Sequence, residues 1–329
     1  MRKIDYYGTL GPSSESVGVL EGLINAGMTG IRINLSHCSL EDSAGWIDNL
    51  REAEKRTNRR IKLLIDLQGP ELRIGILSSP LEMKDGQEAL LGKTGIPVPA
   101  EVYEKITKNQ EILLDDGLIK LEAIYQDGMD WHCRVINGGI LTSRKSIALP
   151  GVDIKLPALT DSDYKNISLA KYYGVTGVMQ PFVRSREDLM AVRDALDKAG
   201  EGEVEIFAKI ENKEGLAMLP QLIDCCHEIV VARGDLGNSM PLWKLPGVQK
   251  SIANYCRENG KPFMVVTQML NSMHFSPVPT RAEVMDIYNA VIDGASSLML
   301  TGETAAGKYP VEAMKYLVAT GEEAARDYI

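Results

Sequence analysis

Short runs of apolar and β-branched residues recur along the chain. Each run is followed by polar residues and then by a segment with the spacing of an amphipathic helix. This alternation constrains the fold more than any other feature. It predicts eight strands, over residues 4–9, 30–35, 61–67, 175–179, 204–210, 228–232, 262–267 and 296–300. Helices are predicted over residues 40–56 and 186–199, and a last helix begins at Pro310.

Eight parallel strands that alternate with helices are the content of a TIM barrel. A doubly wound open sheet could hold many such units, but no glycine-rich dinucleotide-binding turn follows the first predicted strand. We therefore predict an α/β protein with a (β/α)8 barrel.

The third connection, residues 76–157, is far longer than the others. It contains alternating apolar and polar stretches at residues 111–121 and 131–136, with turn signals at Asp116-Gly117, Asp127-Gly128 and Asn137-Gly138-Gly139. This pattern predicts a small β-rich lid domain at 76–157, inserted into a barrel formed by residues 1–75 and 158–329. Because the insertion leaves the barrel at the end of a strand, we expect it to cover the mouth of the barrel.

Composition excludes several classes of partner. The formal net charge of -9 opposes broad attraction to nucleic acid or to an anionic membrane. No apolar run approaches the roughly 20 residues of a membrane helix, and the first residues lack the apolar stretch of a secretion signal, so we expect a cytoplasmic protein. Five scattered cysteines lack zinc or redox spacing and are expected to be reduced: Cys38, Cys133, Cys225, Cys226 and Cys256.

Nearly every predicted strand ends in polar residues, and in a barrel these ends share one mouth. Arg32, Asn34 and Ser36 alternate along the second strand, so they face the same side. Each such residue has a simple structural explanation, for example an ion pair or a helix cap. Together, however, so many charges in one mouth require a charged ligand. The other members of the set are Thr9, Asp66, Lys209, Glu211, Arg233, Asp235, Thr267, Gln268, Thr301 and Glu303.

The set suits transfer of an anionic group with a hard divalent ion. Glu211 and Asp235 offer the carboxylate oxygens that Mg²⁺ prefers, and Mn²⁺ could replace it. Arg32 and Lys209 supply positive charge for a moving phosphoryl group. If the backbone around Gly234 and Asp235 opens a helix, its amides can hold a substrate carboxylate.

Six motifs in this order resemble the successive signatures of the pyruvate kinase family, and the similarity runs from Tyr7 to about Ala325. The motifs are Gly30-Ile31-Arg32-Ile33-Asn34-Leu35-Ser36-His37, Asp66-Leu67-Gln68-Gly69-Pro70-Glu71-Leu72-Arg73, Lys209-Ile210-Glu211-Asn212, Ala232-Arg233-Gly234-Asp235-Leu236-Gly237, Thr267-Gln268-Met269-Leu270 and Gly302-Glu303-Thr304-Ala305.

The resemblance implies a glycolytic transferase that converts phosphoenolpyruvate and ADP into pyruvate and ATP. It implies catalytic roles for Lys209, Thr267 and Arg32, with Thr267 beside the methylene carbon of the substrate. Gly234 and Asp235 would complete the substrate site. A potassium site is implied at Asn34, Ser36, Asp66 and the carbonyl of Leu67, and Glu71 is the residue type that accompanies potassium dependence. The implied nucleotide-binding residues are Pro12, Asn34, His37, Arg73, Asp115 and Lys145.

Several positions depart from the family pattern. The usual Asp-Thr-Lys-Gly-Pro reads Asp66-Leu67-Gln68-Gly69-Pro70, so a hydroxyl and a positive charge are replaced. Pro181 and Thr301 stand where serine is usual, and Ala306 stands where lysine is usual. None of these changes removes Lys209 or an expected metal ligand.

Members of this family normally continue into a further α/β domain that binds effectors and forms a subunit interface. The sequence ends at Arg326-Asp327-Tyr328-Ile329, so we expect no effector control through such a domain, and a homodimer through barrel helices in place of a tetramer. Two alternatives to an active pyruvate kinase stay open. One is an enzyme acting on another 2-oxo acid or enol phosphate, and the other is a non-catalytic paralogue that binds a metabolite.

Overall fold

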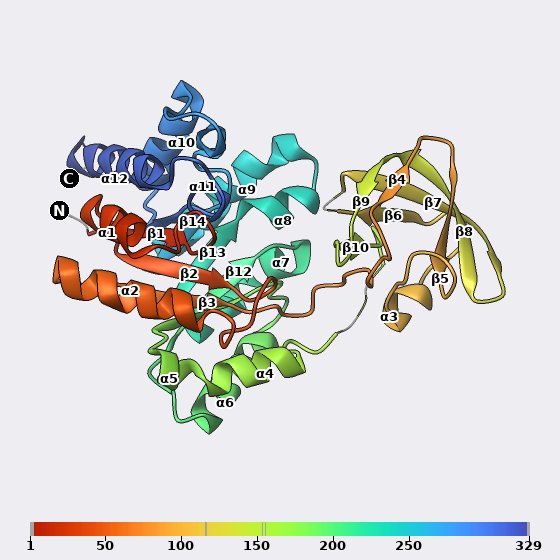
Figure 1. Ribbon diagram of the computed structural model, residues 1–329, viewed down its shortest axis with the longest axis horizontal. Helices are drawn as coiled ribbons and strands as arrows, with labels where there is room; N and C mark the ends of the chain where they lie inside the picture. The colour runs from red at the N-terminus through yellow and green to blue at the C-terminus, as the bar shows by residue number, and fades with distance from the viewer. Residues whose placement is uncertain (1–2, 116, 153, 155, 328–329) are drawn as a thin grey trace. The chain divides into compact units, whose positions relative to one another are not determined.

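The chain forms two compact units, and each is described by itself. The computed structural model describes residues 3–115, 117–152, 154 and 156–327 (Figure 1). The first unit comprises Met1–Gly69 and Ala158–Ile329, and the second comprises Pro70–Pro157. No helix among the described residues is long and apolar enough to cross a bilayer.

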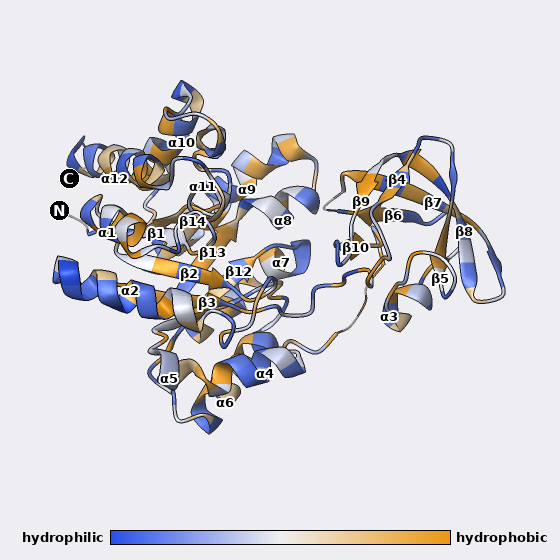
Figure 2. Cartoon of the chain, viewed as in Figure 1, coloured by the Kyte–Doolittle hydropathy of each residue, from blue (hydrophilic) through white to orange (hydrophobic). Residues whose placement is uncertain are grey.

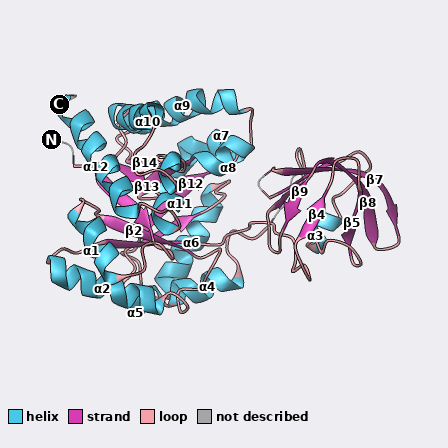
Figure 3. Cartoon of the chain, turned by 45° about the horizontal axis from the view of Figure 1, so that its top comes forward, coloured by secondary structure: helices cyan, strands magenta, loops and turns pink. Residues whose placement is uncertain are grey.

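The first unit is a closed barrel of eight parallel strands, in the order β1-β15-β14-β13-β12-β11-β3-β2. Helices surround these strands, as Figure 3 shows in cyan and magenta. The predicted barrel is therefore confirmed. Its strands are β1 (Asp5–Thr9), β2 (Gly30–Asn34), β3 (Lys62–Asp66), β11 (Gly177–Gln180), β12 (Glu205–Ile210), β13 (Glu228–Ala232), β14 (Phe263–Val266) and β15 (Ser297–Met299).

The helix predicted over residues 186–199 is α6 (Arg186–Lys198), and the last helix begins at Pro310 as predicted. The helix predicted from residue 40 begins only at Ala44. Its first turn is replaced by a local turn in which Ser39 donates from N and Oγ to Asp42. The helix that begins at Ala44 is α2 (Ala44–Thr57), and the last helix is α12 (Pro310–Asp327). The other helices of this unit are α1 (Val17–Asn25), α4 (Asp161–Ser168), α5 (Ala170–Tyr173), α7 (Lys213–Leu222), α8 (Arg233–Asn238), α9 (Leu245–Glu258), α10 (Arg281–Ile292) and α11 (Gly302–Ala305), with short 3-10 turns η1 (Ile223–Cys225), η2 (Leu242–Lys244) and η3 (Asn271–His274).

The barrel is filled by side chains and has two apolar layers. One layer lies inside the strands and includes Tyr7, Phe207 and Met264. The other lies between strands and helices, where the strands are the most apolar part of the unit (Figure 2). Gly30 makes room for the inner layer, because a Cβ there would lie 2.1 Å from the Tyr7 ring. The inside of the barrel is therefore a packed core and not a pore.

The second unit is built from antiparallel strands, as the alternation of its sequence predicts. A five-stranded sheet has the order β10-β6-β7-β8-β5, and a two-stranded sheet joins β4 and β9. The unit already includes Arg73 and Ile74, since Arg73 forms a bridge with Ser146 and the Ile74 amide donates to the Lys145 carbonyl at 2.9 Å. Asp116, one of the predicted turn residues, lies outside the described residues. The elements are β4 (Leu81–Met83), β5 (Glu88–Gly92), α3 (Ala100–Tyr103), β6 (Glu111–Leu114), β7 (Ile119–Asp127), β8 (Asp130–Asn137), β9 (Gly139–Leu141) and β10 (Ile147–Ala148).

Candidate active site

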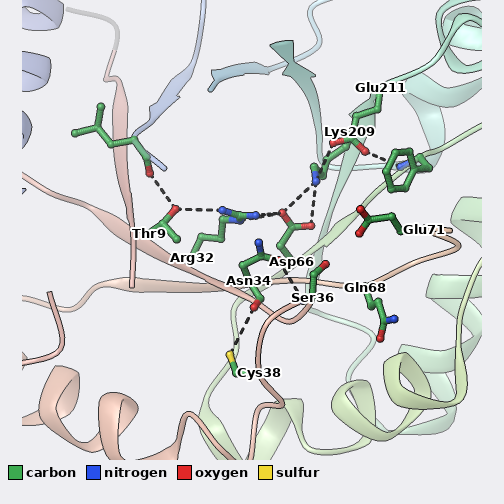
Figure 4. A network of polar contacts seen from close by, with 12 residues as sticks. Thr9, Arg32, Asn34, Ser36, Cys38, Asp66, Gln68, Glu71, Lys209 and Glu211 are labelled. Atoms are coloured by element: carbon green, nitrogen blue, oxygen red, sulfur yellow. Dashed lines mark hydrogen bonds and ion pairs between the residues drawn. The ribbon is translucent and has the colours of Figure 1, made fainter. Parts of the chain in front are cut away.

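A chain of charges links three neighbouring parts of the barrel mouth. Arg32, on β2, contacts Asp66 at the end of β3 through Nε at 2.8 Å and a terminal nitrogen at 2.7 Å. Lys209, on β12, lies 3.1 Å from the same carboxylate and 2.9 Å from Glu211. Figure 4 shows Arg32 and Lys209 converging on Asp66. The structure therefore brings together Arg32, Asp66, Lys209 and Glu211, which the sequence predicted to meet at the barrel mouth.

The alternation along β2 is confirmed by burial. Ile31 and Ile33 are buried in the strand-helix layer, whereas Arg32 and Asn34 are only partly buried at the mouth. Arg32 also donates to the Thr9 hydroxyl at 3.3 Å, and Asn34 Oδ1 accepts from the Ser36 amide at 3.2 Å. These contacts orient Arg32 and the start of the loop after β2.

Glu211 is buried and Lys209 is largely buried, and each alters the protonation of the other. Burial opposes a charge on Lys209, but attraction to Asp66 and Glu211 outweighs it and raises the pKa of the ammonium. For Glu211, burial dominates over the attraction of Lys209, and repulsion from Asp235 and Asp66 adds to it, so its pKa rises to about 7. Glu211 therefore feels two other carboxylates, and a bound cation would favour its ionised form.

Backbone contacts fix the second oxygen of Glu211. Its Oε2 accepts from the Phe182 amide at 2.8 Å, and Phe182 has a positive φ of 52°. Phe182 directly follows Pro181, one of the departures from the family pattern. Glu211 Oε1 is paired with Lys209 and remains available as a ligand for a divalent cation, which could bind beside the ammonium or in its place.

The helix expected after Gly234 is present, because α8 begins at Arg233. Gly234 and Asp235 therefore lie in its first turn. A Cβ on Gly234 would lie 3.2 Å from Thr267 Cγ2, so this backbone approaches the end of β14 closely. Thr267 itself has a φ of 78°. The structure thus brings the predicted carboxylate-binding amides next to the predicted catalytic threonine.

The end of β15 is organised by a buried carboxylate. Glu303 accepts from the Thr301 amide at 2.8 Å and from the Leu270 amide at 3.1 Å. The Thr301 hydroxyl also contacts Glu303, at 3.3 Å, so replacing the usual serine by threonine preserves a hydroxyl here. Glu303 joins the loops after β14 and β15 and has no predicted role in substrate binding.

Sequence reasoning missed Asp163, which is completely buried. Its carboxylate accepts from the Gln68 amide at 2.8 Å, the Gly69 amide at 3.1 Å and the Thr160 amide at 2.8 Å. The capping-box pattern Thr160-x-x-Asp163 could have predicted the helix cap. The contacts to the loop after β3 could not have been predicted, because they join residues more than 90 positions apart.

Three of the predicted ligand residues, Arg73, Asp115 and Lys145, belong to the second unit. Arg73 pairs with Glu71 at 2.7 Å and donates to the Arg144 carbonyl at 2.7 Å. Lys145 pairs with Asp115 at 2.7 Å. These pairs are internal to the unit, so the nucleotide-binding roles of Arg73, Asp115 and Lys145 stay predictions.

The remaining predicted residues lie in loops at the ends of β1, β2 and β3. Pro12 is exposed, and the His37 amide donates to the Asn34 carbonyl at 3.3 Å. Leu67 is buried, with its amide bound to the Met179 carbonyl at 3.1 Å. The Leu67 side chain therefore belongs to the core. Leucine in place of the usual threonine keeps the backbone of this loop in position, because the Leu67 amide is still hydrogen-bonded.

The donor set suits Mg²⁺ better than a transition metal. Within the described ranges no three histidine, cysteine, aspartate or glutamate side chains form a metal-binding group. Mg²⁺ commonly takes one or two carboxylates and completes its shell with water and substrate oxygens. Glu211 and Asp235 repel each other, since Asp235 contributes to the raised pKa of Glu211, and a divalent ion would relieve this repulsion.

Comparisons with known proteins agree with this architecture. The family model described as pyruvate kinase, barrel domain, matches residues 1–314. A protein named pyruvate kinase from Geobacillus stearothermophilus is 39% identical over 95% of this chain and 55% of its own length. Those of Staphylococcus epidermidis and Staphylococcus aureus are 40% and 38% identical over all of this chain and 58% of their own length. The chain thus spans little more than half the length of these relatives. With the barrel and its mouth in place, the match over most of the sequence shows that the chain belongs to the pyruvate kinase family.

Proposed function

We propose that the protein transfers a phosphoryl group between phosphoenolpyruvate and ADP to give pyruvate and ATP. The observation that carries the proposal is the ion-paired chain Arg32–Asp66–Lys209–Glu211 at one barrel mouth, in which both carboxylates are buried. Its two cations come from separate strands and share one carboxylate, which suits a site that receives an anion.

Lys209 and Arg32 stabilise negative charge on the phosphoryl group during transfer. Both are held in place before substrate arrives, because Asp66 binds each of them. Preorganised charge of this kind contributes more to phosphoryl transfer than flexible surface charge does. Asp66 is therefore a positioning residue in addition to a proposed potassium ligand.

Glu211 and Asp235 would hold Mg²⁺, or Mn²⁺, which would neutralise phosphate oxygens when bound. The amides of Gly234 and Asp235, in the first turn of α8, bind the substrate carboxylate. Thr267 lies beside Gly234, and we assign to it the delivery of a proton to the methylene carbon of the enol.

The potassium and nucleotide sites follow the family pattern. Asn34, Ser36, Asp66 and the Leu67 carbonyl would bind K⁺, with Glu71 favouring potassium dependence. Because the Leu67 side chain is buried in the core, the change at this position leaves a carbonyl ligand available. By the same pattern, the proposed nucleotide-binding residues are Pro12, Asn34, His37, Arg73, Asp115 and Lys145.

Initial rates with phosphoenolpyruvate, ADP and Mg²⁺, with and without K⁺, test the proposal. We expect turnover by the wild type and a loss of at least about 1,000-fold in Lys209→Met, since the missing charge acts in the transition state. Lys198→Met, at an exposed position on α6, is the matched control. Absence of turnover by the wild type would favour one of the two alternative functions.

The cytoplasmic location and the homodimer also stay proposals. An exposed apolar pair on η2, Leu242 and Trp243, supports association through the barrel, because large apolar side chains on a surface often mark an interface.

A further inference from the structure

A second charged cavity lies at the opposite end of the barrel from Asp66. It has a volume of about 340 Å³, within the usual range for small-molecule sites. It is lined by Arg51 on α2, by Arg60, Ile61 and Lys62 at and just before the start of β3, and by residues 171–174 and Thr176 around α5. We refer to it as the basal pocket. Lys62 begins the strand that ends in Asp66, so the pocket and the proposed active site occupy opposite ends of β3.

The lining of the basal pocket is cationic in a protein with a net charge of -9. Four of its side chains are basic, and none of its lining residues is acidic. The carboxylates that pair with these cations belong to Glu54, Asp5 and Glu201, which are not lining residues. Glu205 and Glu228 also attract Lys62 without pairing with it, so the cations that remain for a ligand are Arg60 and Lys171, which are exposed and only loosely paired.

One wall of the basal pocket is fixed by Arg51. Its guanidinium donates to the carbonyls of Tyr173 and Gly174 at 3.0 and 3.1 Å and to Glu54 at 3.0 Å. The other oxygen of Glu54 accepts from the Ile61 amide at 2.7 Å. These bonds hold the turn after α5 against the start of β3, so the pocket exists before any ligand binds.

The other cations retain donors for a ligand. Lys171 Nζ lies 3.8 Å from Glu201, which is beyond hydrogen-bond distance. Arg60 gives a single N–H to Glu54, at 3.2 Å, and its side chain is 86% exposed. Since a guanidinium has five N–H donors and an ammonium has three, both side chains can bind an oxyanion without breaking an existing contact.

An aromatic side chain adds a second kind of contact. Tyr172 is 83% exposed and meets the Tyr173 ring edge-on, with centroids 4.9 Å apart. Its free face can cover a planar or apolar part of a ligand. Cations beside an exposed aromatic ring match a molecule that combines a phosphate with a compact organic body.

We propose that the basal pocket binds a small phosphate-bearing metabolite at a site separate from the barrel mouth. Arg60 and Lys171 contact the phosphate, Arg51 shapes the wall, and Tyr172 covers the organic part. The proposal depends on the lining residues alone and holds whether or not the mouth has the proposed activity.

An NMR resonance from Tyr172 reports binding at the basal pocket, and ligand binding at the barrel mouth would not be mistaken for it. The protein is labelled with 3-fluorotyrosine, and the Tyr172 ¹⁹F signal is assigned from its loss in Tyr172→Phe. Titration with inorganic phosphate at constant ionic strength is expected to shift this signal with saturation. The double variant Arg60→Gln/Lys171→Gln should weaken phosphate binding at this signal by about 10-fold, because two charge-assisted contacts are lost. Both residues are exposed, so folding should be unaffected.

The matched control Lys198→Gln/Lys315→Gln removes the same charge at exposed positions outside the pocket and should keep wild-type binding. Titration with AMP, followed through the ¹⁹F signal of the adjacent lining residue Tyr173, distinguishes the ligand body: binding tighter than phosphate that is lost in Tyr172→Ala indicates a nucleotide, and equal binding indicates a non-aromatic phosphate ester. A Tyr172 signal that does not move with either probe, or equal weakening in the control, would overturn the proposal. Turnover is measured in parallel, so a failure of the proposed function is recognised separately.

Discussion

The guanidinium of Arg233 holds the backbone carbonyl of Thr267 with two hydrogen bonds, from Nε at 3.0 Å and from a terminal nitrogen at 2.7 Å. Its remaining terminal nitrogen contacts Asp286 on α10 at 2.6 Å. Thr267 and the next residue, Gln268, both have positive φ, 78° and 55°. Such a conformation is costly for a β-branched residue and persists only where surrounding contacts enforce it. Arg233 therefore stabilises a strained turn at the barrel mouth.

Arg233→Lys should impair catalysis more than stability. Lysine keeps the charge but cannot donate two N–H groups in the fixed geometry of a guanidinium. The Thr267 turn should relax and move its hydroxyl, and a displacement near 1 Å can cost about 100-fold in rate. We expect kcat for phosphoenolpyruvate to fall by about that factor with a smaller change in KM. Arg257→Lys, at an exposed position on α9, serves as the control, and equal kcat values in both variants would contradict the role of Arg233.

Asp163 anchors both chain segments that join the two units. It binds the amides of Gln68 and Gly69, just before the second unit, and that of Thr160, just after it. Asp163→Asn replaces an acceptor oxygen by a donor, so at least one buried amide loses its partner. We expect the free energy of unfolding of the first unit to fall by about 2 kcal/mol.

Thermal denaturation and limited proteolysis measure this effect. Cleavage should become faster near residues 68–70 and 158–160. The control is Asp161→Asn, two positions earlier in α4, where the side chain is exposed. Similar melting of the two variants would show that the linker segments do not depend on Asp163.

Glu228 should make stability depend on pH. Burial raises the pKa of its carboxyl, and the hydroxyls of Ser296 and Ser297 only partly oppose this effect. Asp5 raises it further and Lys62 lowers it. The folded state therefore binds a proton more tightly than the unfolded state, whose glutamate pKa is about 4.3. The contribution of Glu228 to stability is fully present below that value and is lost as the pH rises through the folded pKa.

The variant Glu228→Gln tests this sign. It cannot lose a proton, and its amide oxygen can still accept from the two serines. We expect it to melt above the wild type at pH 8 and to converge with it toward pH 4, in melting curves taken at constant ionic strength. A melting difference that does not change with pH would exclude Glu228 as the titrating group.

The strands and the mouth could be predicted because both depend on local patterns. An apolar run such as residues 229–232 is buried on both faces in a barrel, and alternation places Arg32 and Asn34 on one side. The start of α2 was predicted four residues early. The apolar spacing continues through Leu40, but the Ser39–Asp42 turn competes with helix formation.

Contacts between distant residues were not predictable. The sequence placed Arg32, Asp66 and Lys209 at one barrel mouth, but it did not show that Arg32 and Lys209 share the Asp66 carboxylate, which lies 143 positions before Lys209. Arg233 was expected only as a polar residue at a strand end. Its hydrogen bonds to the Thr267 carbonyl depend on the positive φ of Thr267, which a β-branched residue disfavours. Only the three-dimensional packing around this turn imposes that conformation.

Trp243 is the best single position for testing the homodimer. Its side chain is 81% exposed, and the adjacent Leu242 is 69% exposed. Water contact with two neighbouring large apolar side chains is unfavourable, so a second copy of the chain covering η2 would stabilise the dimer. We expect sedimentation velocity to show a dimer for the wild type and a shift toward monomer for Trp243→Glu. Tyr172→Glu adds the same charge at another exposed aromatic residue and should leave the dimer intact. A monomeric wild type at micromolar concentration, or identical profiles for the two variants, would rule out association through η2.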